Sequence, residues 1–254
     1  MVSGRAPSVL LLTEDTGGSS FAVLRALIEK MFYLLEPMSD VRRVRFDPAD
    51  EKARAAMGWN AWKEHGPRGD RVRVDLRQAI ATRLLHKDGL GFVLVHVDGD
   101  RRWADSKGGT RADNIEQFKK LVLPGIASLL AAKGQTEKIH RLVMVVPFWC
   151  MEAWLYQNVA EALRIYEKHH PDAREDIELF AKTWRVDPGA LDEVEYPKKR
   201  VRIQDRHNLQ LATERFPAER AHRAGKSFAL VVETLRCCPG LSEALAELRF
   251  PAPA

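Results

Sequence analysis

The fold is indicated first by the stretch FVLVHVDGD, which occupies residues 92–100. A short, largely apolar run of this kind is typical of a buried β-strand, and Asp98 and Asp100 follow where that strand meets its loop. Residues i and i+2 of an extended segment point the same way, so both carboxylates can reach one cation, while Gly99 lets the backbone turn closely. Oxygen ligands of this type suit a hard divalent cation. The alternative is that Asp-Gly-Asp only forms a turn.

Two other apolar runs, outward from this stretch, resemble it. Residues 8–13 (SVLLLT) and residues 142–146 (LVMVV) are predicted to be buried strands, and Pro147 ends the second. Apolar residues recur at helical spacing in residues 21–35 and 73–86. Strands that alternate with helices indicate an α/β fold, with a mostly parallel sheet flanked by helices.

Four further segments are predicted from weaker patterns. Residues 41–46 alternate apolar and basic side chains over most of their length, as in a half-exposed strand, and residues 47–70 suggest an excursion with a short helix. Residues 112–133 predict a helix that Pro124-Gly125 kinks or splits. The apolar stripe over residues 151–166 predicts one further helix.

The character of the chain changes after residue 170, where charged, helical segments follow. We therefore predict an α/β core over residues 6–170. A helical, basic extension over residues 171–254 is expected to pack on this core. The chain carries a net charge of +5, but residues 198–226 contain nine Lys or Arg and three Asp or Glu. This local excess of six leaves a net charge of −1 on the remainder.

A basic excess concentrated in one segment is what a phosphate-facing surface needs. The candidates for contact with a nucleic-acid backbone are Lys198, Lys199, Arg200 and Arg202. A solvated helical surface is the alternative interpretation. Arg101 and Arg102 could likewise neutralise a transferred phosphate, or only balance the acidic pair that precedes them.

The composition excludes several classes of protein. No apolar run approaches the roughly 20 residues that span a bilayer, and the first residues lack the apolar region of a signal peptide. We therefore expect a cytoplasmic protein with no membrane partner. Cys150, Cys237 and Cys238 match neither a disulfide framework nor a zinc site, so they are predicted to be small buried hydrophobic residues.

Acidic residues follow all three apolar strands. Glu14 follows the first, Asp98 and Asp100 follow the second, and Glu152 comes shortly after the third. Because the carboxyl ends of parallel strands open onto one edge of a sheet, we expect these residues to converge. Glu14 could be a metal ligand or a general acid or base, or only an acid near a helix N-terminus. Glu152 could be a further metal ligand or a first-turn helix acid.

One more strand residue, His96, is predicted to be a buried residue rather than a ligand. The Gly17-Gly18 loop could cradle a phosphate, but no lysine follows the glycines as in a Walker A loop, so a simple turn is the preferred interpretation.

These motifs resemble the Toprim (topoisomerase–primase) domain family, which has a glutamate at the end of its first strand and an Asp-x-Asp pair at the end of a later one. Glu14 and the Asp98-Gly99-Asp100 segment match these positions. Residues 147–155 (PFWCMEAWL) and the Cys238-Pro239 region are similar to small stand-alone bacterial Toprim-like proteins associated with phage defence. The resemblance covers about residues 6–170. Arg102 stands where many members carry a third acid.

The resemblance implies a nuclease that depends on Mg²⁺ or Mn²⁺ and cleaves DNA or RNA, as the effector of an anti-phage system. Asp98 and Asp100 would hold the metal, and Glu14 would be a ligand or a general acid or base. The resemblance is also compatible with an ATPase partner and with a homo-oligomer. The alternatives are a non-catalytic nucleic-acid-binding or adaptor subunit of an ATPase complex, or a nucleotide-dependent phosphoryl or glycosyl transferase that uses the Asp-x-Asp pair.

Overall fold

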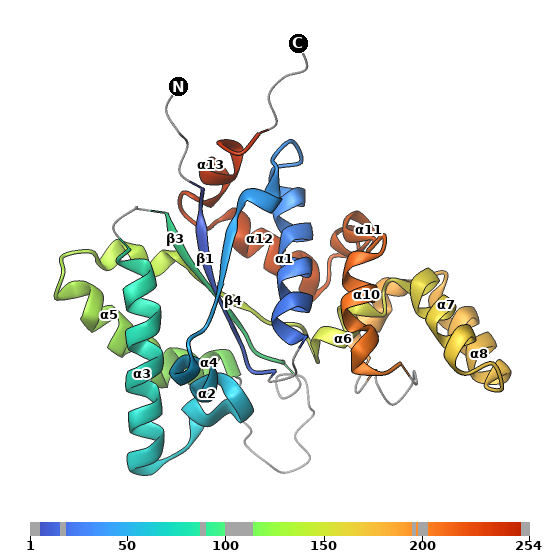
Figure 1. Cartoon of the computed structure of the whole chain (residues 1–254), viewed down its shortest axis with the longest axis horizontal. Helices are drawn as coiled ribbons and strands as arrows, with labels where there is room; N and C mark the ends of the chain where they lie inside the picture. The colour runs from blue at the N-terminus through green and yellow to red at the C-terminus, as the bar shows by residue number, and fades with distance from the viewer. Residues whose placement is uncertain are drawn as a thin grey trace.

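A four-stranded, all-parallel sheet forms the centre of the protein (Figure 1). The computed structural model describes residues 6–15, 19–86, 90–99, 114–194, 197 and 203–249. The strand order is β2-β1-β3-β4, and the strands are β1 (Ser8–Thr13), β2 (Arg45–Pro48), β3 (Gly91–His96) and β4 (Leu142–Val145). The predicted α/β fold with a parallel sheet and flanking helices is confirmed, and it is consistent with a Toprim-like core.

The two central strands, β1 and β3, pair along their whole length. Their register runs from Ser8 opposite Gly91 to Thr13 opposite His96. Both strands are buried on both faces, which explains why their sequences are nearly continuous apolar runs. Because the two strands end level with each other, the residues that follow them emerge at the same edge of the sheet.

One face of the sheet packs against helices from both halves of the chain. Val9 and Leu11 of β1 and Phe92 and Leu94 of β3 point toward this face, as the period of two in a strand requires. The helices that share this core include α1 (Ser20–Leu35), α6 (Met151–Leu155), α10 (Asn208–Thr213), α11 (Ala218–Arg223) and α12 (Ser227–Arg236). The C-terminal helices therefore belong to the same hydrophobic core as the sheet.

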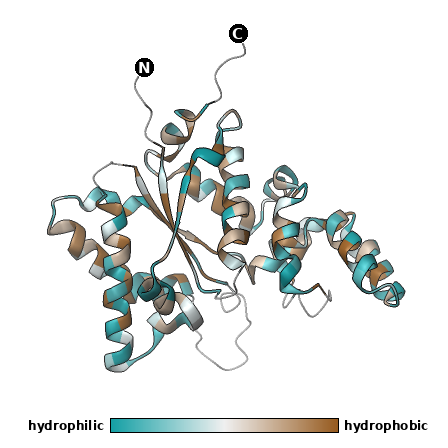
Figure 2. Ribbon diagram, in the orientation of Figure 1, coloured by the Kyte–Doolittle hydropathy of each residue, from teal (hydrophilic) through white to brown (hydrophobic). Residues whose placement is uncertain are grey.

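The opposite face carries a second hydrophobic core, formed with the helices between β2 and β4. Leu10, Leu12, Val93 and Val95 point toward it. Its helices are α2 (Glu51–Met57), α3 (Gly66–Leu84), α4 (Asn114–Leu121) and α5 (Leu123–Ala131). Figure 2 shows the result, with mostly hydrophobic strands at the centre and hydrophilic stretches on the flanking helices.

The remaining helices lie in the C-terminal half or join other elements. α7 (Val159–His169) and α8 (Arg174–Trp184) pack on each other and project away from the sheet (Figure 1). This half also contains the 3₁₀ helices η3 (Thr136–Arg141), η4 (Pro188–Glu193) and η5 (Asp205–His207), and the helix α13 (Leu241–Ala246). Within the described residues, no helix has the length and apolar content needed to span a bilayer.

Two predictions for the segment before α3 are wrong in part. Residues 41–46 do not form one strand, because a 3₁₀ turn, η1 (Val41–Arg43), precedes β2 and pairing with β1 starts only at Arg45. Residues 47–70 contain α2 and the 3₁₀ helix η2 (Gly58–Lys63) instead of a single short helix. In addition, α3 starts at Gly66, before the predicted residue 73, with Pro67 in its first turn, where no intrahelical N–H is needed.

The helix predicted over residues 151–166 is broken into α6 and α7 at Asn158. The Asn158 side chain donates from Nδ2 to the carbonyl oxygens of Leu211 (3.0 Å) and Glu214 (2.7 Å). These carbonyls lie at the C-terminal end of α10. The break between α6 and α7 thus coincides with a contact between Asn158 and a distant segment of the chain. The split predicted near Pro124 is confirmed, since α4 ends at Leu121 and α5 starts at Leu123.

The predicted environment of the cysteines is confirmed only for Cys238, which is buried. Cys150 is half-buried, and Cys237, the residue directly after α12, is exposed. All three thiols are free, as expected for a chain without a disulfide framework.

A buried hydrogen-bond network ties η4 to α12 and α6. Asp192 is fully buried and accepts hydrogen bonds from the backbone N–H and the hydroxyl of Ser227, both at 2.7 Å. The Ser227 hydroxyl in turn accepts a hydrogen bond from Trp154 Nε1 at 2.7 Å. Burial raises the pKa of Asp192 to about 6, although the hydrogen bonds from Ser227 oppose the shift.

The raised pKa of Asp192 predicts a pH-dependent stability. The folded protein keeps the Asp192 proton up to about pH 6, whereas the unfolded chain releases it near the ordinary value of 3.8. Asp192 therefore lowers the free energy of unfolding as the pH rises through this window, by about 3 kcal/mol in total. Urea unfolding of wild type and Asp192→Asn between pH 4 and pH 7 measures this contribution. The free energy of unfolding of wild type minus that of the variant is expected to fall as the pH rises. A difference that stays constant would contradict the raised pKa of Asp192.

Candidate active site

The ends of β1 and β3 bring two of the predicted acidic residues together. Glu14 follows β1, and its Oε1 atom accepts a hydrogen bond of 2.6 Å from the backbone N–H of Asp98. The backbone N–H of Glu14 donates to the carbonyl oxygen of His96 at 3.2 Å. This convergence results directly from the register of the two strands, in which Thr13 lies opposite His96.

The turn at Asp98 is held from several sides. Asp98 Oδ1 lies 3.3 Å from the backbone N–H of Met151, the first residue of α6, and accepts its hydrogen bond. The Asp98 carbonyl oxygen accepts a hydrogen bond of 2.5 Å from Asn114 Nδ2. Gly99 lies so close to the carbonyl oxygens of Pro147 and Phe148 that a Cβ atom would collide with them. The segment after β4 thus packs directly on the loop after β3.

The imidazole of His96 links both strand ends beneath this turn. Its ring is 1% exposed, which confirms the predicted buried position. Nδ1 lies 3.0 Å from Thr13 Oγ1, and Nε2 lies 3.4 Å from Asp98 Oδ1, a contact that falls short of hydrogen-bond geometry. Burial disfavours the protonated ring, but the contact with Asp98 and the charges of Asp98 and Glu14 outweigh it, so the pKa of His96 lies above its ordinary value.

The Glu14 carboxylate is left incompletely satisfied. Burial and the negative charge of Asp98 raise the pKa of Glu14, although the charge of His96 and the Asp98 N–H oppose this. Its Oε2 atom is buried and has no hydrogen-bond partner among the described residues. Asp98 uses Oδ1 for the contacts above, and its side chain is 31% exposed. A buried carboxylate oxygen beside a second carboxylate calls for a proton or a cation.

The two carboxylates fit a divalent cation, which would sit against Glu14 Oε2 and the Asp98 carboxylate. Mg²⁺ is usually held by one or two carboxylates and keeps several waters or substrate phosphate oxygens as its other ligands. Among the described residues, no three His, Cys, Asp or Glu side chains form a group that could hold a metal ion. Asp100, the other predicted ligand, lies outside the described residues.

Glu152 follows Met151 in α6 and faces α10. Glu152 is 5% exposed, and its Oε1 atom accepts a hydrogen bond of 3.3 Å from Asn208 Nδ2. Its neighbours include the Cys150 thiol and the Tyr156 hydroxyl. Burial, followed by the charge of Glu152, raises the pKa of both groups well above their ordinary values, so both keep their protons at neutral pH. The burial of Glu152 and its hydrogen bond to Asn208 therefore indicate that this residue packs behind the site.

Sequence reasoning missed three polar residues of the site, all from helices on the second face of the sheet. Lys63, at the end of η2, donates a hydrogen bond to Asn114 Oδ1. Asn114 Nδ2 in turn donates a hydrogen bond to the Asp98 carbonyl oxygen. Asn60 lies near Glu14 in the left-handed region, with φ of 56°, a conformation that asparagine tolerates. The only local signal was the turn-forming Gly58 and Asn60 in an otherwise irregular segment.

The other predicted site residues lie outside the described residues. They are Asp100, Arg101 and Arg102 after β3, and Lys198, Lys199, Arg200 and Arg202 in the basic segment. The Gly17-Gly18 loop lies outside them as well. Comparisons with models of known protein families, with curated proteins and with solved structures find no match to this chain, so the resemblance to Toprim domains stays a prediction that rests on the motif residues quoted above.

Proposed function

We propose that this protein cleaves phosphodiester bonds in DNA or RNA with a divalent metal ion, Mg²⁺ or Mn²⁺. The observation that carries the proposal is the junction of Glu14 and Asp98 at the carboxyl edge of the sheet, where Glu14 Oε2 is buried without a partner among the described residues. Open α/β sheets bind their ligands at this edge. A cation between the two carboxylates would satisfy both the unpartnered oxygen and the adjacent negative charges.

The contacts of Asp98 and Glu14 suggest a different role for each carboxylate. A bound divalent cation supplies Lewis-acid stabilisation of a phosphate and a more acidic water. Asp98 is the fixed ligand, because Met151 N–H holds Oδ1 and Asn114 holds the backbone of the turn. Glu14 presents Oε2 as a ligand or as the group that accepts and returns a proton, and the upward shift of its pKa by burial and by Asp98 makes it a stronger proton acceptor than an exposed glutamate.

Nucleic acid as the substrate is supported by the basic excess over residues 198–226. The Toprim resemblance supports the same substrate, and it also suggests an effector role in phage defence in the cytoplasm, with an ATPase as partner. These roles are parts of the proposal that depend on the resemblance alone.

A cleavage assay tests the proposed function. The purified chain is incubated with duplex DNA, single-stranded DNA and tRNA, with Mg²⁺, with Mn²⁺ or with EDTA. We expect cleavage of at least one polymer that requires the metal and is lost in the double variant Glu14→Gln/Asp98→Asn. The control is Glu178→Gln, which removes an exposed carboxylate on α8 and should cleave like wild type.

Three results would contradict the proposal and point elsewhere. Metal-dependent cleavage that survives in the double variant would remove these residues from the site. Turnover of nucleotides or nucleotide-sugars without cleavage of any polymer would favour a transferase. Nucleic-acid binding that is equal in wild type and double variant, with cleavage in neither, would favour an adaptor.

A further inference from the structure

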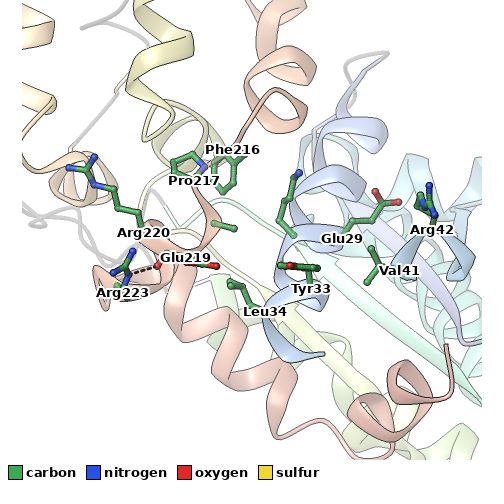
Figure 3. Close-up of a pocket in the computed structure, with 12 residues that line it drawn as sticks. Glu29, Tyr33, Leu34, Val41, Arg42, Phe216, Pro217, Glu219, Arg220 and Arg223 are labelled. Carbon is green, nitrogen blue, oxygen red and sulfur yellow. Dashed lines mark hydrogen bonds between the residues drawn. The ribbon is translucent and has the colours of Figure 1, made fainter. Parts of the chain in front are cut away.

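The geometry of a cavity between α1 and α11 points to a ligand site that is independent of the proposed nuclease. We infer that this cavity binds a small anion that carries a flat apolar ring and has about the size of a mononucleotide. Its volume is about 610 Å³, within the range of small-molecule sites. Figure 3 shows that its walls come from the second half of α1, from η1 and from the segment that begins α11.

The apolar part of the cavity can accommodate a ring. Tyr33 of α1 remains 47% exposed although it lines the cavity, and Leu34 and Val41 lie near it. Phe216 contributes from the opposite wall (Figure 3). The residue before it, Arg215, adopts the left-handed conformation with φ of 51°, which is unfavourable for a side chain of this kind. A half-exposed aromatic ring beside apolar side chains is a surface on which a planar ligand can stack.

The charged side chains of the cavity favour an anion. Four cationic side chains line it, and the two acidic ones are Glu29 and Glu219. Glu29 is already paired with Arg25 at 2.8 Å. The cationic residues are Lys30, Arg42, Arg220 and Arg223.

Three of these cations have no carboxylate partner within the described part of the chain. Arg42 is the exception, since its Nε atom lies 2.7 Å from Asp40. Within the described residues, Arg220 donates only to the carbonyl oxygens of residues 185 and 186, at 3.1 and 3.0 Å. Arg223 donates there only to the carbonyl oxygen of Glu219 at 3.4 Å, and Lys30 forms no ion pair with any other described residue. Carbonyl groups leave the positive charge uncompensated, so a phosphate or carboxylate group of a ligand would complete the site.

The cavity is separate from the Glu14–Asp98 site. Glu14 precedes the N-terminal end of α1, whereas Tyr33 lies in its last turn. At 1.5 Å per residue, the helix between Ser20 and Tyr33 is about 20 Å long. A ligand bound here is therefore distinct from a substrate of the candidate active site.

Isothermal titration calorimetry tests the inference with defined probes. These are the four ribonucleoside 5′-monophosphates and indole-3-acetate as ring-bearing anions, with adenosine and inorganic phosphate as the separate parts. We expect saturable binding of at least one ring-bearing anion, about 10-fold or more tighter than either part alone. Tighter binding of the nucleoside monophosphates would identify the ligand as a nucleotide. Tighter binding of indole-3-acetate would identify it as an aromatic carboxylate.

Four variants locate the binding. Tyr33→Ala and Arg223→Gln should each weaken it by about 10-fold, because a ring contact or a charge-assisted hydrogen bond is lost. Glu219→Gln should tighten it, because an acidic side chain is removed from the cavity. Asp98→Asn should leave it unchanged, and thermal unfolding of each variant verifies the fold.

Three outcomes would overturn the inference. The first is the absence of saturable binding for every probe at millimolar concentration. The second is inorganic phosphate that binds as tightly as the ring-bearing anions. The third is binding that is lost in Asp98→Asn but unchanged in Tyr33→Ala and Arg223→Gln. None of these outcomes requires the cleavage assay to fail, so the two proposals fail separately.

Discussion

Asp98→Asn is expected to weaken Mn²⁺ binding by at least about 100-fold, since even partners behind a metal ligand commonly contribute 10- to 100-fold. The asparagine has nearly the same size, and its Oδ1 atom can still accept the hydrogen bond from the Met151 N–H. What it lacks is the negative charge beside Glu14 Oε2, the buried oxygen that has no partner among the described residues. The substitution should therefore remove the cation site and leave the fold intact.

Calorimetric titration with Mn²⁺ measures this effect, together with thermal unfolding of the metal-free protein. Glu178→Gln is the matched control, because it removes one carboxylate of the chain from an exposed position on α8. It should bind Mn²⁺ like wild type. An Asp98→Asn variant that is folded and binds Mn²⁺ with unchanged affinity would exclude the Glu14–Asp98 pair as the metal site.

Trp154→Ala is expected to lower the free energy of unfolding by about 4 kcal/mol, the usual cost of truncating a fully buried aromatic residue. Trp154 is fully buried on α6 and meets the ring of Phe228 on α12 edge to face, with ring centroids 5.6 Å apart. Its Nε1 atom also donates to the Ser227 hydroxyl that holds Asp192. The truncation would leave a cavity and remove one donor from this buried network.

Trp154→Phe is the milder variant. It keeps a buried aromatic ring but loses the indole N–H and the rest of the five-membered ring, so we expect a smaller loss of about 2 kcal/mol. Guanidinium chloride unfolding of the three proteins gives both values. Because α6 also presents the Met151 N–H to Asp98, the alanine variant should weaken Mn²⁺ binding as well. A loss below about 1 kcal/mol for Trp154→Ala would show that α6 is not anchored through this side chain.

The sequence alone predicted the parts of the fold that depend on local hydrophobic patterns. The run at residues 8–13 is a strand buried on both faces, where continuous apolar side chains are needed. The run at 142–146 is also a strand, but it ends at Val145 and, as the edge strand β4, it alternates half-buried and buried side chains, so its predicted full burial is wrong. Parallel strands then place their carboxyl ends on one edge, which is why the meeting of Glu14 and Asp98 could be expected. The same reasoning predicted residues 41–46 poorly, since an edge strand pairs on one side only and its pattern is weak.

Only the tertiary structure decided which polar side chains from distant segments come into contact, because these segments share no local sequence pattern. Asn114 and Lys63 come from helices on the second face of the sheet, yet they hold the turn at Asp98. Glu152 accepts a hydrogen bond from Asn208, which belongs to a helix of the C-terminal half. Hydrophobic periodicity records which face of an element is buried, but it carries no information about which polar side chains meet across the core. The sequence by itself thus determined the sheet and the Glu14–Asp98 edge, and the packing of the helices determined the polar residues that surround that edge.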